Sequence, residues 1–181
     1  MSQSRPDSKK ICEINIPLER DVFLRDLIRE LSGLLEDMVG LEETSGFISV
    51  VGQNIGTQIN QLYRQELGIP KLNREQVAEV LANLKNRIRG EFSIDEQDDS
   101  RIVFKCTACP FGDKVKDRSS LCMMTSNVFG VITADNLGYA KVSLEKTIAR
   151  GDPECRVVVY LEPENAQTKA ASGREYYEAE N

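Results

Sequence analysis

The sequence predicts an α+β protein in which N-terminal helices pack on a small antiparallel sheet. In the first half of the chain, apolar residues recur at helical spacing, whereas the second half contains short apolar segments separated by turn residues. The chain shows no long alternation of strands and helices, which a doubly wound parallel sheet would require. With 181 residues, it is long enough to bury the core of one domain without disulfides.

Three helices are expected before the sheet begins. The first spans residues 24–38, where leucines and isoleucine recur at helical spacing between charged residues, and Gly40 is expected to end it. The second is residues 43–67. The third begins at residues 73–76, where asparagine and glutamine form a capping-box variant, and it ends at Gly90.

The second of these helices, residues 43–67, combines an apolar stripe with Gly46, Gly52 and Gly56. Each glycine weakens a helix by about 1 kcal/mol relative to alanine. Glycines at this spacing let another backbone approach closely. They therefore indicate either tight packing within the subunit or a dimer seam or ligand-pocket wall. The candidate pocket residues, for a small apolar ligand, are Phe47, Val51, Ile55 and Phe129.

The second half of the chain predicts two β-hairpins separated by a helix. Residues 92–95 and 101–106 form the first strand pair, on either side of a turn rich in aspartate. The helix spans residues 121–135. Residues 139–144 and 156–161 form the second pair, and the connection between them contains Arg-Gly-Asp-Pro, a strong turn signal.

Composition excludes several classes of function. The chain has 40% hydrophobic residues, a net charge of -6 and no histidine. A protein this acidic is not expected to bind nucleic acid directly, and no apolar run is long enough to span a membrane. We expect a cytoplasmic protein.

The chain divides into three predicted parts. Residues 1–18 are a flexible lead-in that lacks the apolar segment of a signal peptide. Residues 19–162 form a single domain. Residues 163–181 are polar and are expected to be a disordered tail.

Four of the five cysteines lie within one stretch of the chain. In a reducing compartment, clustered cysteines more often bind metal or carry out redox chemistry than form disulfides. Cys106 and Cys109 have the two-residue spacing of a metal knuckle. Cys122 is expected in the first turn of a helix, where the helix dipole favours a thiolate. We predict one all-thiolate metal site formed by Cys106, Cys109, Cys122 and Cys155.

The expected metal is zinc, because closed four-cysteine sites are most often structural zinc sites. The chain has only one Cys-x2-Cys knuckle, however, whereas a zinc ribbon has two. An iron–sulfur cluster is the alternative, favoured by Pro110 after Cys109 and by the apolar residues around Cys122. A dithiol switch and a set of buried core thiols are the metal-free alternatives. Cys12 lies apart from the four and has no predicted role.

These motifs resemble the methanogen output domain and, more distantly, the 4-vinyl reductase type of small-molecule-binding domain. The resemblance covers residues 20–162. Its segments are Cys106-x2-Cys109-Pro-Phe-Gly, Cys122-Met-Met-Thr, Gly138-Tyr-Ala-Lys-Val and Arg150-Gly-Asp-Pro-x-Cys155-Arg-Val. The resemblance implies N-terminal helices that dimerise and cysteines that hold a metal near a ligand-sized cavity. It also implies sensing or output in signalling beside kinases, phosphatases or transcription regulators.

The resulting expectation is a cytoplasmic, homodimeric signalling domain. Its four-cysteine metal site would sense a small ligand or redox state and pass the signal to a protein partner such as a kinase, phosphatase or transcription regulator. A reductase-like enzyme is an alternative suggested by the name of the vinyl-reductase family. We do not expect an enzyme, because the chain has no histidine for general base chemistry and no phosphate-binding glycine loop. A bare protein-interaction module is the third alternative.

Overall fold

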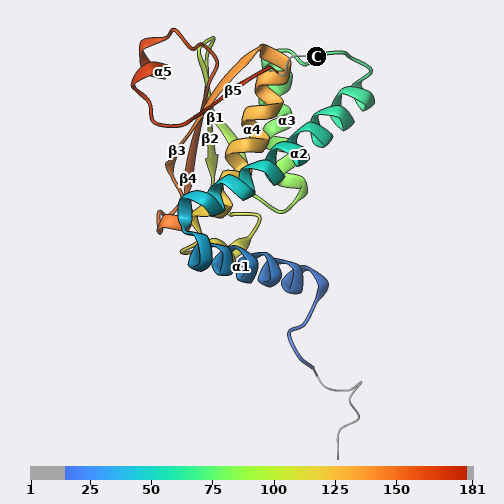
Figure 1. Cartoon of the computed structure of the whole chain (residues 1–181). Coiled ribbons are helices and arrows are strands. Elements are labelled where there is room, and N and C mark those ends of the chain that lie inside the picture. The colour runs from blue at the N-terminus through green and yellow to red at the C-terminus, as the bar shows by residue number, and fades with distance from the viewer. Residues whose placement is uncertain (1–14, 179–181) are drawn as a thin grey trace, which may run out of the picture.

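A five-stranded antiparallel sheet forms the centre of the structure, with its strands in the order β1-β2-β4-β3-β5 (Figure 1). This computed structural model describes residues 15–178. The strands are β1 (Phe92–Gln97), β2 (Arg101–Cys106), β3 (Tyr139–Lys146), β4 (Cys155–Tyr160) and β5 (Arg174–Tyr177). The helices are α1 (Arg20–Val39), α2 (Leu41–Leu67), α3 (Arg74–Arg87), α4 (Cys122–Leu137) and the short α5 (Ala166–Ala170). The predicted α+β class with an antiparallel sheet is therefore confirmed.

Helix α4 lies between the sheet and α2, and its residues are buried on nearly every side (Figure 1). A helix that is apolar around its whole circumference has to be covered by protein on all faces. Its Phe129 is fully buried and packs edge-on against Phe104 and Phe92, with ring centroids 5.1 and 5.8 Å apart. The main apolar core is formed by the sheet together with α4 and the buried face of α3.

Gly52 and Gly56 of α2 serve packing within the subunit, one of the two roles considered from the sequence, whereas Gly46 has open space around it. A Cβ atom added at Gly52 would lie 2.9 Å from the Cβ of Asn127 on α4. One added at Gly56 would lie 3.2 Å from the Cα of Val128. Gly52 and Gly56 thus occupy the contact with α4, and Ile59 and Tyr63 pack on the core. The other large apolar residues of α2 include five that are exposed, namely Phe47, Val50, Val51, Ile55 and Leu62.

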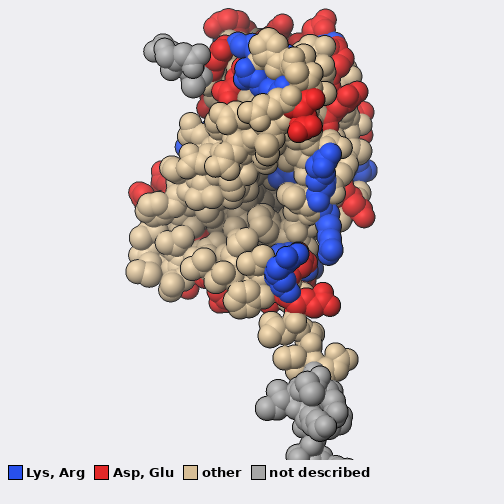
Figure 2. Space-filling model, turned by 90° about the vertical axis from the view of Figure 1, so that its right-hand side faces the viewer, with Lys and Arg blue, Asp and Glu red and all other residues tan. Residues whose placement is uncertain are grey.

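Helices α1 and α2 expose many large apolar side chains, which together we call the outer apolar face. Figure 2 shows a broad area of one side of the molecule without charged side chains. None of the helices within residues 15–178 is long and apolar enough to span a membrane. The outer apolar face comprises Phe23, Leu24, Leu27, Ile28, Leu31, Leu34 and Met38 on α1 and Phe47, Val50, Val51, Ile55 and Leu62 on α2.

The C-terminal segment corrects the expectation of a disordered tail from residue 163. This segment forms α5 and then β5, which pairs with β3. Tyr176 packs on Gly130 of α4, and its hydroxyl lies 2.8 Å from that of Ser126. The segment is mostly polar, and the prediction of disorder rested on that composition. It did not take account of Tyr176 and Tyr177, which supply apolar area and favour a strand. The expected lead-in, residues 1–18, lies largely outside the described residues, as does Cys12.

Candidate functional site

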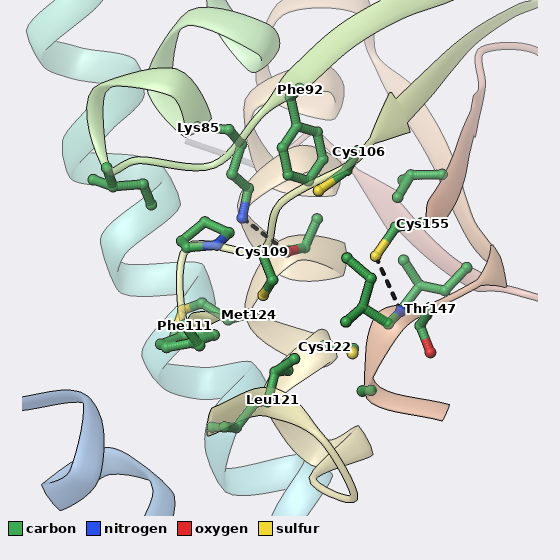
Figure 3. Close-up of a pocket in the computed structure, with 18 of the residues that line it drawn as sticks. Lys85, Phe92, Cys106, Cys109, Phe111, Leu121, Cys122, Met124, Thr147 and Cys155 are labelled. Atoms are coloured by element: carbon green, nitrogen blue, oxygen red, sulfur yellow. Dashed lines mark hydrogen bonds between the residues drawn. The ribbon is translucent and has the colours of Figure 1, made fainter. Parts of the chain in front are cut away.

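Three segments of the chain bring Cys106, Cys109, Cys122 and Cys155 to one cavity (Figure 3). Cys106 ends β2 and Cys155 begins β4, and the antiparallel register pairs these two residues directly. Cys109 lies in the loop after β2, and Cys122 begins α4. The structure thus gathers all four predicted site residues around the same space, which we call the cysteine cavity.

The cysteine cavity has a volume of about 220 Å³ and mainly apolar walls. It lies between the sheet, the start of α4 and the last turn of α3. Two residues of α1, Asp21 and Arg25, also line it. The apolar lining includes Phe92, Phe111, Leu121, Met124, Leu144 and Val157. Walls of low polarity increase the effect of any charge placed beside them.

The four thiols are electrostatically different from one another. Burial raises the pKa of Cys109 and raises that of Cys122 to about 12. A hydrogen bond with Cys106 lowers the pKa of Cys155, and the same interaction raises the pKa of Cys106. The backbone N–H of Ile148 also donates to the sulfur of Cys155, at 3.3 Å. Cys155 is therefore the thiol best prepared to ionise.

The four sulfurs surround the cavity without converging on one point. Within residues 15–178, no three histidine, cysteine, aspartate or glutamate side chains lie close enough together to bind a single metal ion. A zinc ion would require each sulfur to lie about 2.3 Å from the same centre. The predicted donor set is therefore assembled in a wider arrangement than mononuclear zinc needs.

Lys85, which the sequence analysis did not select, also lines the cysteine cavity. It lies four residues after the buried Leu81 and eight after Val77, a spacing that places it on the core face of α3. Its Nζ donates to the Thr125 hydroxyl at 2.7 Å. Burial lowers the pKa of Lys85 to about 8, and negative charge on the nearby cysteines opposes that shift. Helical spacing in the sequence was the signal that could have identified it.

The four candidate ligand-pocket residues do not line the cysteine cavity. Phe129 is fully buried between α4 and the sheet, whereas Phe47, Val51 and Ile55 belong to the exposed outer apolar face. Gly52 and Gly56 lie against α4, whereas Phe47, Val51 and Ile55 lie on the exposed side of α2. The residues that line the cavity come mainly from the sheet, the loop after β2 and the start of α4.

Helix α1 is attached to the cysteine loop, residues 107–121, mainly by polar contacts. Arg29 donates through Nη1 to the carbonyl oxygens of Lys114 and Lys116, at 2.7 Å each. Near the other end of α1, Glu36 accepts a hydrogen bond from the hydroxyl of Ser120 at 2.5 Å. The loop that contains Cys109 is thus tied to the helix whose opposite side contributes to the outer apolar face.

Comparison with known proteins gives a family and a shared fold. The family described as methanogen output domain 1 matches residues 27–160. The crystal structure of the phenol-responsive sensory domain of the transcription activator PoxR with phenol is similar in fold, with a TM-score of 0.59 and 15% identity, covering 86% of this chain and 81% of that chain. A trafficking protein particle complex subunit 3 from Naegleria fowleri, covalently bound to palmitic acid, has a TM-score of 0.55 and 13% identity, covering 77% and 96%. No curated protein sequence matches this chain.

Proposed function

Since this chain belongs to the methanogen output domain 1 family, we propose that it is a signalling domain that reports the state of its cysteine cavity to a protein partner. The observation that carries the proposal is the meeting of four thiols from three segments of the chain around one mainly apolar space. Cys106 and Cys155 also pack with the main apolar core, and Cys109 and Cys122 pack with a smaller apolar cluster around Leu121. Such a set is suited to binding a metal centre or to responding to oxidation.

We infer that the occupant is a metal centre held by the thiolates of Cys106, Cys109, Cys122 and Cys155. An iron–sulfur cluster is favoured over a single zinc ion, because cysteines that bind different iron atoms surround the cluster. Sulfurs arranged around a cavity of about 220 Å³ suit that geometry. When bound, such a cluster would supply one-electron redox chemistry and sensitivity to oxygen. Zinc would instead hold the three segments together without redox chemistry.

The proposed route for the signal is from the cysteine loop to α1. Loss or change of the centre would release Cys109 and alter the loop to which Arg29 and Glu36 are bonded. Helix α1 would then shift against the body of the domain. Its own buried residues are only Ser32 and Gly33, so little apolar packing opposes such a movement.

The partner that receives this movement is proposed to be a second copy of the chain. Contiguous apolar patches larger than a few hundred Å² are rare on soluble monomers. The outer apolar face includes side chains such as Leu34, Met38 and Val50, which are 57, 71 and 59% exposed. A symmetric dimer would cover this face on both copies at once.

The metal centre is tested by anaerobic purification, followed by a visible absorption spectrum and analysis of iron, sulfide and zinc in the same sample. A brown protein with iron and sulfide in cluster proportion would support the proposal, and Cys122→Ser or Cys155→Ser should abolish the colour. Cys12→Ser is the matched control, since this fifth cysteine lies outside the predicted set. A colourless protein with stoichiometric zinc would instead select the structural metal. Metal-free protein would contradict both.

The dimer is tested by Leu27→Glu combined with Leu31→Glu, which places charges on the α1 part of the outer apolar face. Light scattering should show a dimer for the unaltered protein and a monomer for the double variant. Tyr177→Ser is the control, because it changes a similarly exposed residue at the edge of the sheet. A monomer at all concentrations before mutation would refute this part of the proposal.

A second candidate function is direct binding of a small apolar ligand in the cysteine cavity. The walls are mainly apolar, and a cavity of about 150 Å³ is sufficient to bind benzene in another protein. The similar PoxR sensory domain was solved with phenol. Phenol should then raise the melting temperature of metal-free protein, and Val157→Trp, which fills the cavity, should remove that effect.

A further inference from the structure

Lys85 places a positive charge beside the four thiols with little to neutralise it. The residue is only 4% exposed, and its Nζ donates one side-chain hydrogen bond, to Thr125. The same nitrogen lies 5.5 Å from the ring centroids of both Phe92 and Phe129. Among residues 15–178, no carboxylate forms an ion pair with it. Figure 3 shows its amine directed into the cavity, toward the side where Cys109 lies.

The other buried lysine of the described chain has both a hydrogen-bond acceptor and a carboxylate partner. Lys141, on β3, is 8% exposed. Its Nζ donates to the carbonyl oxygen of Thr168 at 2.9 Å and lies 3.4 Å from a carboxylate oxygen of Glu175. Lys141 therefore shows how this fold accommodates a structural lysine. Lys85 departs from that pattern at the position where four thiols can provide negative charge.

A buried charge without a partner is costly unless another group compensates it. Aromatic faces offset part of that cost, but they do not supply a counter-ion. The negative charge has to come from thiolates or from a molecule that occupies the cavity. A neutral apolar ligand would leave Lys85 uncompensated, whereas a metal centre held by four thiolates has a net negative charge.

We propose that Lys85 is the counter-charge of an anionic, thiolate-held metal centre, which it selects over neutral occupants and whose reduction potential it raises. The inference rests on the proposed function, because it needs Cys106, Cys109, Cys122 and Cys155 as ligands. Reduction of a bound iron–sulfur centre would add one electron from an external one-electron donor, such as dithionite, and would break no bond, so the negative charge beside Lys85 would increase. A fixed positive charge stabilises the more negative state. Lys85 is thus a tuning residue and does not ligate the metal.

The test compares Lys85→Met, Lys85→Arg and the matched control Lys141→Met, each purified anaerobically as the full chain. Three quantities are measured: metal and sulfide content, the midpoint potential in a dye-mediated titration, and the rate at which a chelator removes the metal. Lys85→Met should lower the potential and speed metal release about tenfold. Lys85→Arg and Lys141→Met should stay near the unaltered protein. The release rate also applies if the metal is zinc, which has no redox readout.

The outcomes separate this inference from the proposed function. If the unaltered protein binds the centre and Lys85→Met matches it in potential and release rate, the role of Lys85 is wrong while the metal site stands. If Lys141→Met changed the potential and the release rate as much as Lys85→Met, the effect would reflect the loss of any buried lysine. That result would also overturn the inference. If the unaltered protein takes up no metal, even after anaerobic reconstitution with iron and sulfide, the proposed function fails and this inference fails with it.

Discussion

Replacing Lys85 with methionine is expected to stabilise the metal-free protein, although the lysine lies in the core. Its pKa falls from 10.5 to about 8 in the folded state because of burial. At 1.36 kcal/mol per pKa unit, holding the charged form in the cavity at pH 7 costs about 3 kcal/mol. Methionine removes that cost and forfeits the hydrogen bond to Thr125, which is worth about 1 kcal/mol. The free energy of unfolding should therefore rise by about 2 kcal/mol.

The assay is urea unfolding of reduced, chelator-treated protein, with Lys141→Met as the comparison. Lys141 has a carbonyl and a carboxylate partner, so its replacement should lower the free energy of unfolding by about 1 kcal/mol. Because the folded-state pKa of Lys85 is depressed, its cost is present below pH 8 and declines as the pH rises from about 8 to 10.5. The gain from Lys85→Met should shrink across the same interval. A variant that is less stable at pH 7 than the unaltered protein would refute the reasoning.

Two further predictions concern packing around α4. Gly56→Val should destabilise the protein by about 2 kcal/mol in urea unfolding, because its side chain would meet the backbone of α4, whereas Gly46→Ala, with open space around it, should be neutral or stabilising. Equal effects of the two substitutions would contradict the packing role. Tyr176→Ala should cost about 3 kcal/mol and speed hydrogen exchange of β5, because it removes the contact with α4. The exposed Tyr177→Ala should change either quantity far less, and similar exchange in both variants would show that β5 does not depend on this contact.

Periodicity alone predicted most of the elements. Local patterns of apolar and turn residues predict the helices before the sheet, the central helix and both hairpins. These patterns indicate which face of each segment is buried. The capping box at Asn73 and Gln76 is present in the structure as both of its hydrogen bonds. Local patterns could not reveal α5 and β5. Strand β5 pairs with β3, and its Tyr176 contacts α4, and both partners are distant from it in the chain.

The composition and spacing of the cysteines by themselves determined which residues form the candidate site. Four thiols in a chain without histidine leave few other candidates for a soft-metal ligand set. Only the tertiary structure decided that the sulfurs surround a cavity, that Lys85 lies among them, and that the apolar stripe of α2 points outward. Each of these depends on how α3, α4 and the sheet pack against one another. Sequence spacing reports the face of a single element, whereas a site between elements is created by their packing.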